Sequence, residues 1–187
     1  ELLEMDERSG PAAARNAAAQ RARGDILFFV DADVLLHQKA LGRAAATLDE
    51  QPGIAGVFGS YDDSPPHQGL ISQFKNLGHH FIHQESEPNS SSFWSGCGAI
   101  RKSVFLELGG YDEVRFAHPS IEDIELGSRL RKAGHRILLD RDLLCTHLKE
   151  WTLGSLLHTD IVRRAIPWTR LLLTNGQPQE DLNLKPG

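Results

Sequence analysis

Apolar and polar positions along the chain follow two different periods, and each period predicts a different kind of element. The continuous apolar run Ile26–Val30 has the length and composition of a strand that is buried on both faces, the usual kind in parallel sheets. An alanine-rich segment before it begins after Pro11 and stops before Gly24, as helices do. The predicted order is a helix at 12–22, a strand at 26–30, a helix at 37–50 and a strand at 54–60. This order favours a parallel sheet in an α/β domain.

Helical spacing returns in residues 69–84, where large apolar side chains recur on one face. These residues are Leu70, Phe74, Leu77 and Phe81. His79, His80 and His83 lie on the same segment without an adjacent carboxylate or cysteine, so we interpret them as surface or packing residues rather than metal ligands. Further elements predicted are a short helix from Lys102, a helix that Gly134 ends, strands at 136–139 and 143–147, and a long amphipathic helix from Trp151.

The long C-terminal helix has two interpretations. Its apolar residues, Leu153, Leu156, Leu157, Ile161 and Ile166, line one side, while Arg163, Arg164 and Arg170 supply cations. Such a helix can pack its apolar side on the domain. Tryptophans near both ends, with arginines between them, also suit a helix that lies on a membrane surface.

Composition excludes several functional classes. The 187 residues are 40% hydrophobic and 24% charged, which is typical of one soluble globular domain. A formal net charge of -5 without a basic stripe argues against a nucleic-acid binder. Cys97 and Cys145 lack CxxC spacing, so neither a disulfide framework nor a zinc ribbon is expected, and a reducing cytoplasm fits. Within these residues we expect neither a membrane-spanning run nor a signal peptide.

Two carboxylates one residue apart, Asp31 and Asp33, follow the first predicted strand directly. Ligands of open α/β sheets bind at the carboxyl ends of strands, and paired carboxylates there can hold a divalent cation that also binds substrate phosphates. A turn or a helix cap is the common alternative for such a triplet. The position after a buried strand favours a site for a nucleotide diphosphate.

A second acidic group lies at Glu122, Asp123 and Glu125, at the start of a predicted helix. Ser120 and Asp123 match the spacing of a capping box, which accounts for part of the group. We expect the helix N-terminus to keep Asp123 ionised and available as a base.

Five segments in order resemble the inverting family 2 glycosyltransferases of the GT-A fold, over about residues 10–168. They are ARN at 14–16, GDILFFVDAD at 24–33, SGCGAIRKSVFLELGGYDE at 95–113, IEDIELGSRL at 121–130 and THLKEWT at 146–152. The resemblance implies an α/β three-layer domain with a mixed, mostly parallel sheet. It also implies transfer of a sugar from a nucleotide-diphospho-sugar, such as a UDP- or GDP-sugar, to a carbohydrate or lipid-linked acceptor hydroxyl.

The resemblance also assigns roles by position. Asp123, beside Glu122, matches the general base, and Asp33 matches the ligand of Mg²⁺ or Mn²⁺, with Asp31 on the donor ribose and beside the metal. His147 matches a histidine that completes the metal site in some members. The remaining donor-binding or pocket-lining positions are Arg15, Gly96, Cys97, Gly98, Arg164 and Trp168.

The resemblance implies that this sequence is a fragment, because it has no counterpart of the family's first strands. We expect a catalytic domain at 1–150, an amphipathic and membrane-interfacial helix at 151–175, and a linker at 176–187. Residues 163–168 read RRAIPW, which departs from the element of processive synthases and disfavours processive synthesis. We expect the parent protein to be membrane-bound and the site to lie on the cytoplasmic side.

Two other functions remain open from the sequence. A nucleotidyltransferase also uses paired aspartates, a metal and an α/β sheet. A non-catalytic nucleotide-sugar binding domain would keep the metal site at Asp33 and use Asp123 only for capping.

Overall fold

The computed structural model describes residues 3–5 and 10–175. Its strands are β1 (Ile26–Val30), β2 (Val34–Leu36), β3 (Ile54–Tyr61), β4 (Asn89–Ser90), β5 (Cys97–Arg101) and β6 (Arg136–His147). Its helices are α1 (Pro11–Arg21), α2 (Ala40–Glu50), α3 (Leu70–Glu85), α4 (Lys102–Glu107), α5 (Glu122–Lys132), α6 (Leu153–Leu157) and α7 (Ile166–Asn175), with the π-helical segment η1 (His158–Ala165) between the last two. The predicted linker at 176–187 lies outside the described residues.

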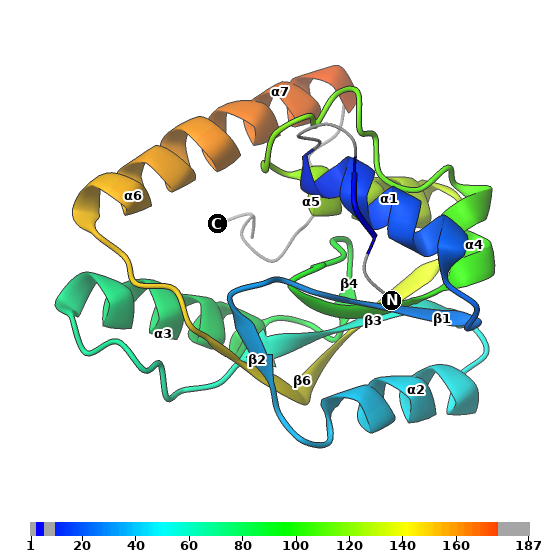
Figure 1. Ribbon diagram of the computed structural model, residues 1–187, viewed down its shortest axis with the longest axis horizontal. Coiled ribbons are helices and arrows are strands. Elements are labelled where there is room, and N and C mark those ends of the chain that lie inside the picture. Colours follow the sequence, from blue (N-terminus) through cyan, green and yellow to red (C-terminus); the bar gives the residue numbers. More distant parts are fainter. Residues whose placement is uncertain (1–2, 6–9, 176–187) are drawn as a thin grey trace.

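One sheet separates two layers of helices, as Figure 1 shows. The helices α1, α4 and α5 cover one face, where their apolar residues pack on Leu27 and Phe29 of β1. The helix α2 covers the other face through Ala44 and Leu48. The α/β three-layer fold class is therefore confirmed.

The direction of the strands differs from the prediction. The sheet order is β1-β5-β3-β6-β2, with β4 also paired to β6. Among the described strands only β3 and β6 run parallel, and every other neighbouring pair is antiparallel. The expectation of a mostly parallel sheet was wrong, because β5 runs between β1 and β3 against both of them.

The burial of the two predicted strands also differs. Every residue of β3 is buried, as predicted for a central strand. In β1, Leu27 and Phe29 are buried, whereas Ile26 and Phe28 are only partly covered and Val30 is 45% exposed. The expectation that β1 is buried on both faces was therefore wrong, and this strand lies at one edge of the described sheet.

The two strands predicted at 136–139 and 143–147 form one strand, β6. Its polar middle, Asp140 to Asp142, remains within the strand, and the register against β3 shifts between Phe58 and Ser60. Arg43 of α2 bonds Asp140 and Asp142, which compensates the charge of this polar stretch.

The helices α3 and α6–α7 form as predicted, but their apolar stripes face solvent. On α3, Leu70 is 81% exposed and Phe74 is 69% exposed, while Ser72, Asn76 and His83 are buried. Along the C-terminal arm, which we define as residues 153–175, Leu153 and Ile161 are more than half exposed. For the C-terminal helix, the interpretation that its apolar side packs on the domain is therefore wrong, and on α3 polar side chains face the domain.

The arm is attached to the domain at both ends. Near its start, Trp151 N–H donates to Ser72 Oγ at 2.8 Å, and Lys75 of α3 pairs with Asp160 at 2.6 Å. Near its end, Leu171 and Trp168 pack with an apolar cluster that includes Ile124 of α5. The arm therefore crosses from α3 to α5 (Figure 1). No helix within the described residues is long and apolar enough to span a bilayer.

Candidate functional site

A cleft of about 740 Å³ opens at the carboxyl end of β1, between α3, the start of α5 and the arm. Seven residues predicted from the sequence line it: Arg15, Asp31, Asp33, Glu122, Asp123, His147 and Arg164. The structure thus brings together side chains from α1, the turn between β1 and β2, α5, β6 and η1.

The aspartates occupy the turn between β1 and β2. Asp31 N–H donates to the carbonyl of Gly96 at 3.2 Å, and Val34 N–H donates to the carbonyl of Asp31 at 3.1 Å, so the turn is fixed by the backbone. The side chain of Asp33 is 47% exposed and projects to the cleft. This arrangement leaves the Asp33 carboxylate accessible to a ligand.

Arg15 of α1 connects two carboxylates. Its Nη2 donates to Asp31 Oδ1 at 2.6 Å and its Nη1 donates to Glu122 Oε1 at 3.2 Å. One guanidinium therefore joins the turn after β1 to the start of α5 and neutralises charge on both.

His147 at the end of β6 faces Asp33. Its Nε2 lies 3.6 Å from Asp33 Oδ2, and its Nδ1 lies 2.7 Å from Oδ1 of Asn76. Tyr61 stacks on its ring, with centroids 4.5 Å apart and planes at 3°. Burial lowers the pKa of His147, although the Asp33 carboxylate opposes the shift, which favours a neutral ring. A proton on Nδ1, donated to Asn76, leaves the Nε2 lone pair directed at Asp33.

This pair fits a divalent cation that completes its coordination with substrate. Two ligands of one ion at about 2.1 Å lie roughly 3–3.5 Å apart, close to the separation of Nε2 and Oδ2. Within the described residues no group of three or more acidic, histidine or cysteine side chains is arranged to hold a metal. Asp31 is bound to Arg15, so of the three predicted ligands only Asp33 and His147 face each other here. Diphosphate oxygens commonly supply the remaining ligands of Mg²⁺ and Mn²⁺.

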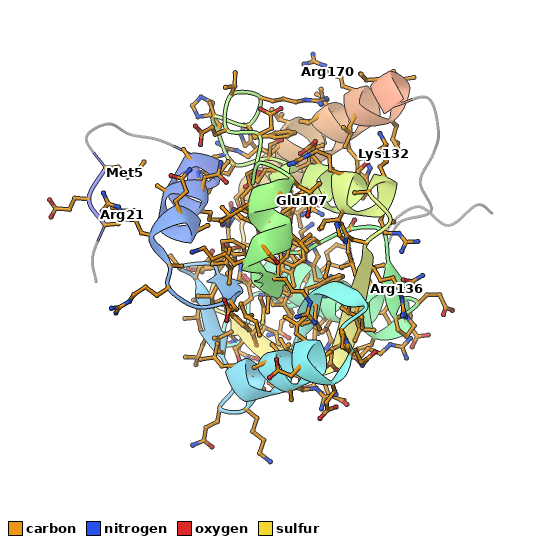
Figure 2. All side chains as sticks on the ribbon, turned by 90° about the vertical axis from the view of Figure 1, so that its right-hand side faces the viewer. Met5, Arg21, Glu107, Lys132, Arg136 and Arg170 are labelled. Atoms are coloured by element: carbon orange, nitrogen blue, oxygen red, sulfur yellow. The ribbon has the colours of Figure 1, made fainter. Side chains whose placement is uncertain are left out.

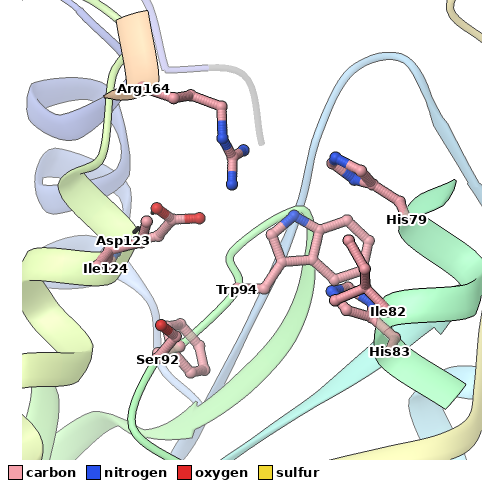
Figure 3. A pocket seen from close by; sticks show the side chains of 9 residues that line it. His79, Ile82, His83, Ser92, Trp94, Asp123, Ile124 and Arg164 are labelled. Atoms are coloured by element: carbon pink, nitrogen blue, oxygen red, sulfur yellow. Dashed lines mark hydrogen bonds between the residues drawn. The ribbon is translucent and has the colours of Figure 1, made fainter. Parts of the chain in front are cut away.

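Asp123 projects into the cleft from the first turn of α5. Burial, and then the charge of Glu122, raise its pKa to about 7, and Arg164 opposes the shift. In Figure 3, Asp123 and the guanidinium of Arg164 point toward each other across the cavity. The helix N-terminus does not hold the pKa of this carboxyl low, because desolvation outweighs the bond that Ile124 N–H donates to it at 2.8 Å.

Glu122 is fully engaged beside it and is only 6% exposed. Its Oε1 accepts from Arg15, and its Oε2 accepts from Ser120 N–H at 2.8 Å. The predicted capping box of Ser120 and Asp123 was wrong, since α5 has no side-chain cap and Ser120 Oγ donates to the carbonyl of Arg163. Both carboxylate oxygens of Glu122 are therefore engaged, whereas Asp123 presents its carboxyl to the cleft.

An aromatic wall lies opposite Asp123, formed by His79 and His83 of α3 and by Trp94 (Figure 3). Burial lowers the pKa of both imidazoles, that of His83 to about 4, with Arg164 adding to the effect. Both rings are therefore neutral near pH 7. A neutral wall of this kind offers stacking and hydrogen-bonding surface to a sugar ring without competing for the proton of Asp123.

The structure does not bring four of the predicted residues into the cleft: Gly96, Cys97, Gly98 and Trp168. A Cβ at Gly96 would lie 2.6 Å from the Trp94 ring, so this glycine admits Trp94 rather than a ligand. The Cys97 side chain is buried against the α2 layer. Trp168 is partly buried in the apolar cluster that holds the arm to α5.

Sequence reasoning missed Asn76, Tyr61 and Trp94. Asn76 is 2% exposed and is the partner of His147, and Trp94 contacts Tyr61 edge to face at 4.8 Å. Asn76 lies on the polar side of the amphipathic helix α3. The sequence could have indicated it only if this polar side had been assigned to the interior.

Comparisons with known proteins identify relatives of this chain. The family model described as Glycosyl transferase family 2 matches residues 1–109. The O-antigen biosynthesis protein RfbC of Myxococcus xanthus is 28% identical over 142 residues, which cover 67% of this chain and 11% of that protein. Glycosyltransferase AglE of Haloferax volcanii is 25% identical over 147 residues, which cover 79% of this chain and 47% of that protein. The chain thus spans less than half the length of these curated relatives.

A solved structure shares the fold. Mannosyltransferase PcManGT from Pyrobaculum calidifontis, in complex with GDP-Man and Mn²⁺, superposes with a TM-score of 0.68 at 21% identity. The superposition covers 97% of this chain and 48% of that one. This similarity is evidence for the fold.

Proposed function

The chain belongs to glycosyl transferase family 2, and from that premise we propose that it carries the catalytic site of a metal-dependent inverting glycosyltransferase. The donor is a UDP- or GDP-sugar and the acceptor is a hydroxyl of a carbohydrate or lipid-linked molecule, in polysaccharide or cell-envelope biosynthesis. The observation that carries this proposal is a single cleft that holds Asp33 with His147 at one side and Asp123, with a pKa raised to about 7, at the other.

In this proposal the donor diphosphate binds at the end of β1. Asp33 Oδ2 and His147 Nε2 would hold Mg²⁺ or Mn²⁺ there, and the cation would act as a Lewis acid toward the leaving diphosphate. Arg164 projects into the same cleft and supplies a cation for the phosphates or for the departing charge. Asp31, held by Arg15, is available to the ribose through its second carboxylate oxygen.

Asp123 acts on the acceptor. Its carboxylate takes the proton of the acceptor hydroxyl as the oxygen forms a bond to the anomeric carbon, and the bond from that carbon to the diphosphate oxygen breaks on the opposite side. A pKa of about 7 suits this role, because the carboxylate is substantially populated at neutral pH and is more basic than an ordinary aspartate. The attack from the opposite side accounts for inversion.

A membrane surface is part of the proposal. Exposed apolar side chains lie along α3 and the arm, among them Phe74, Leu153 and Ile161. We place the catalytic domain at residues 1–150 and an interfacial helix at 151–175, with the parent protein on the cytoplasmic side of a membrane.

The experiment that tests the donor site is calorimetric titration with UDP and with GDP, each with and without Mn²⁺. Metal-dependent binding that Asp33→Asn abolishes supports the site and selects the nucleotide. Asp63→Asn is the matched control, since Asp63 is an exposed aspartate outside the cleft. Binding that needs no metal, or that survives in Asp33→Asn, contradicts the donor assignment.

A transfer assay tests the base. Asp123→Asn should retain donor binding and lose transfer by roughly a factor of 10²–10⁴. Transfer that persists in Asp123→Asn contradicts the assignment of the base. Donor binding without transfer in the wild-type chain favours the non-catalytic binding domain instead.

A further inference from the structure

A second cavity, of about 520 Å³, lies beside the cleft between the loop before α5 and the arm. Its charged and titratable side chains are all basic: Arg115, His118, His158, Arg163 and Arg170. We call it the basic pocket. Among the described residues no aspartate or glutamate lines it, although the whole chain carries a net charge of -5. Composition therefore does not explain its charge.

The arginines of the basic pocket are not balanced by neighbouring acids. Elsewhere Arg15, Arg43 and Arg129 each bond one or two carboxylates. Within the described part of the chain, Arg115, Arg163 and Arg170 form no ion pair. The carboxylate of Asp112 accepts from the backbone N–H of Arg115 at 2.9 Å, not from its guanidinium.

Two of these guanidiniums, those of Arg115 and Arg163, are nevertheless held in place. Arg115 lies over the Phe116 ring, 5.5 Å from its centroid, and Phe116 is buried. Arg163 Nη1 donates to the carbonyl of Pro119 at 3.3 Å, and Ser120 Oγ donates to the carbonyl of Arg163 at 2.9 Å. These contacts fix the arm against the loop. Because these side chains are already ordered, they lose less conformational entropy when an anion binds.

The basic pocket adjoins the catalytic cleft. Pro119, Ser120 and Arg163 line both cavities, and Ser120 precedes Asp123 by three residues. A ligand whose hydroxyl lies at Asp123 could therefore place another group in the basic pocket.

We propose that the basic pocket binds a phosphoryl group, as a monoester or diester, carried by the acceptor. Forked guanidiniums and imidazole N–H groups match phosphate oxygens in charge and geometry. The group lies on the acceptor side, since the donor diphosphate is assigned to Asp33 and His147. That the phosphoryl group belongs to the acceptor rests on the proposed function, whereas its binding in the basic pocket does not.

The test is a titration of the protein with inorganic phosphate, in which NMR records the signals of the arginine Nε–Hε groups. Phosphate should shift the signals of Arg115, Arg163 and Arg170, and Arg115→Gln/Arg170→Gln should weaken binding by roughly tenfold or more. The matched control is Arg21→Gln/Arg136→Gln, which removes the same charge from exposed sites. Figure 2 shows Arg21 and Arg136 on other parts of the surface than Arg170. Absence of these shifts, or equal weakening in the control, would overturn the proposal.

A second arm identifies the source of the phosphoryl group, using phosphatidylcholine vesicles with and without phosphatidylglycerol. Binding that requires phosphatidylglycerol, and that is lost in Arg115→Gln/Arg170→Gln but not in the control, assigns the group to a lipid. Phosphate binding without vesicle binding assigns it to a soluble acceptor. Both results support the pocket.

Failure of the proposed function is recognised separately. In Asp33→Asn, which should not bind the donor, phosphate should still shift the three arginine signals. Phosphate binding that is lost in Asp33→Asn would place the anion in the donor site and overturn the basic pocket.

Discussion

Asp123 combines burial with a neighbouring negative charge, and its pKa of about 7 has consequences for both activity and stability. In the proposed role of general base, Asp123 must be deprotonated in the free enzyme. We expect kcat/KM to rise with pH and to level off above about pH 7. A profile that is flat from pH 5 to pH 8 would contradict this role, and Asp112→Asn, outside the cleft, should leave the profile unchanged.

The same pKa shift acts on stability with a definite sign. The folded state holds the proton of Asp123 more tightly than the unfolded state does. This proton therefore adds to the free energy of unfolding below the unfolded pKa, and the contribution is lost as the pH rises to about 7. Asp123→Asn should therefore raise the free energy of unfolding at pH 8, by about 1–2 kcal/mol, and change it little at pH 4. Urea unfolding at both values measures this difference.

Asn76 should control metal affinity without touching the metal. Because its Oδ1 fixes the tautomer and direction of His147, Asn76→Ala should weaken Mn²⁺ binding by roughly 10–100-fold in the presence of nucleotide. Calorimetry and the electron paramagnetic resonance signal of free Mn²⁺ measure this without an activity assay. Asn89→Ala removes an exposed asparagine as the control. Equal affinities in the two variants would contradict the positioning role.

The residues that sequence alone could predict were those next to a recognisable element. Asp33 follows an apolar strand and Asp123 opens a helix, so local pattern and the family resemblance found both, and the cleft contains both. Asn76 could not be found in this way, because its partner His147 is 71 residues away and only the fold brings them together. The pKa of Asp123 also depends on burial, which no local pattern reveals.

At the scale of elements, α5 depends on a close approach to the loop before β5. A Cβ at Gly127 would lie 2.6 Å from Phe93 N, 2.7 Å from Ser92 Cα and 2.8 Å from Ser91 O, all in the backbone. Gly127→Ala should therefore destabilise the fold by about 1–3 kcal/mol. Thermal unfolding measures the loss.

Gly78 on α3 is the control for this substitution. A Cβ there meets nothing within 4 Å, so Gly78→Ala should stabilise the helix by roughly 0.5–1 kcal/mol. Opposite signs at two helical glycines separate packing from helix propensity. A neutral Gly127→Ala would mean that the loop can retreat from α5.

Element types were predictable, whereas strand direction and helix orientation were not. Periodicity located α3, yet Phe74 faces solvent and Asn76 faces the domain, since the interior next to α3 contains the polar ring of His147. The direction of β5 depends on the connections around it, and no property of the residues Cys97–Arg101 encodes it. Strand pairing is decided by tertiary structure, because side chains alternate along a strand in the same way whether it pairs parallel or antiparallel.

At the scale of the whole molecule, the arm crosses the cleft between two attachments, and the second is apolar. Leu171 is 4% exposed among Phe116, Ile121 and Ile124. Leu171→Ala should speed amide hydrogen exchange in residues 166–175 by roughly tenfold or more, while exchange in β3 changes much less. Leu173→Ala, at a side chain that is 79% exposed, is the control. Uniform acceleration in all elements would instead mean that the arm and domain unfold together.

Arg15 connects the two sides of the cleft, so a ligand bound at one side can affect binding at the other. Its guanidinium holds Asp31, on the proposed donor side of the cleft, and Glu122, which lies beside the proposed base Asp123. A donor that draws Asp31 away from Arg15 leaves more of that positive charge to Glu122, and the field at Asp123 changes with it. The two substrates are then linked through one side chain. By reciprocity, the factor by which a bound donor alters acceptor affinity must equal the factor by which a bound acceptor alters donor affinity.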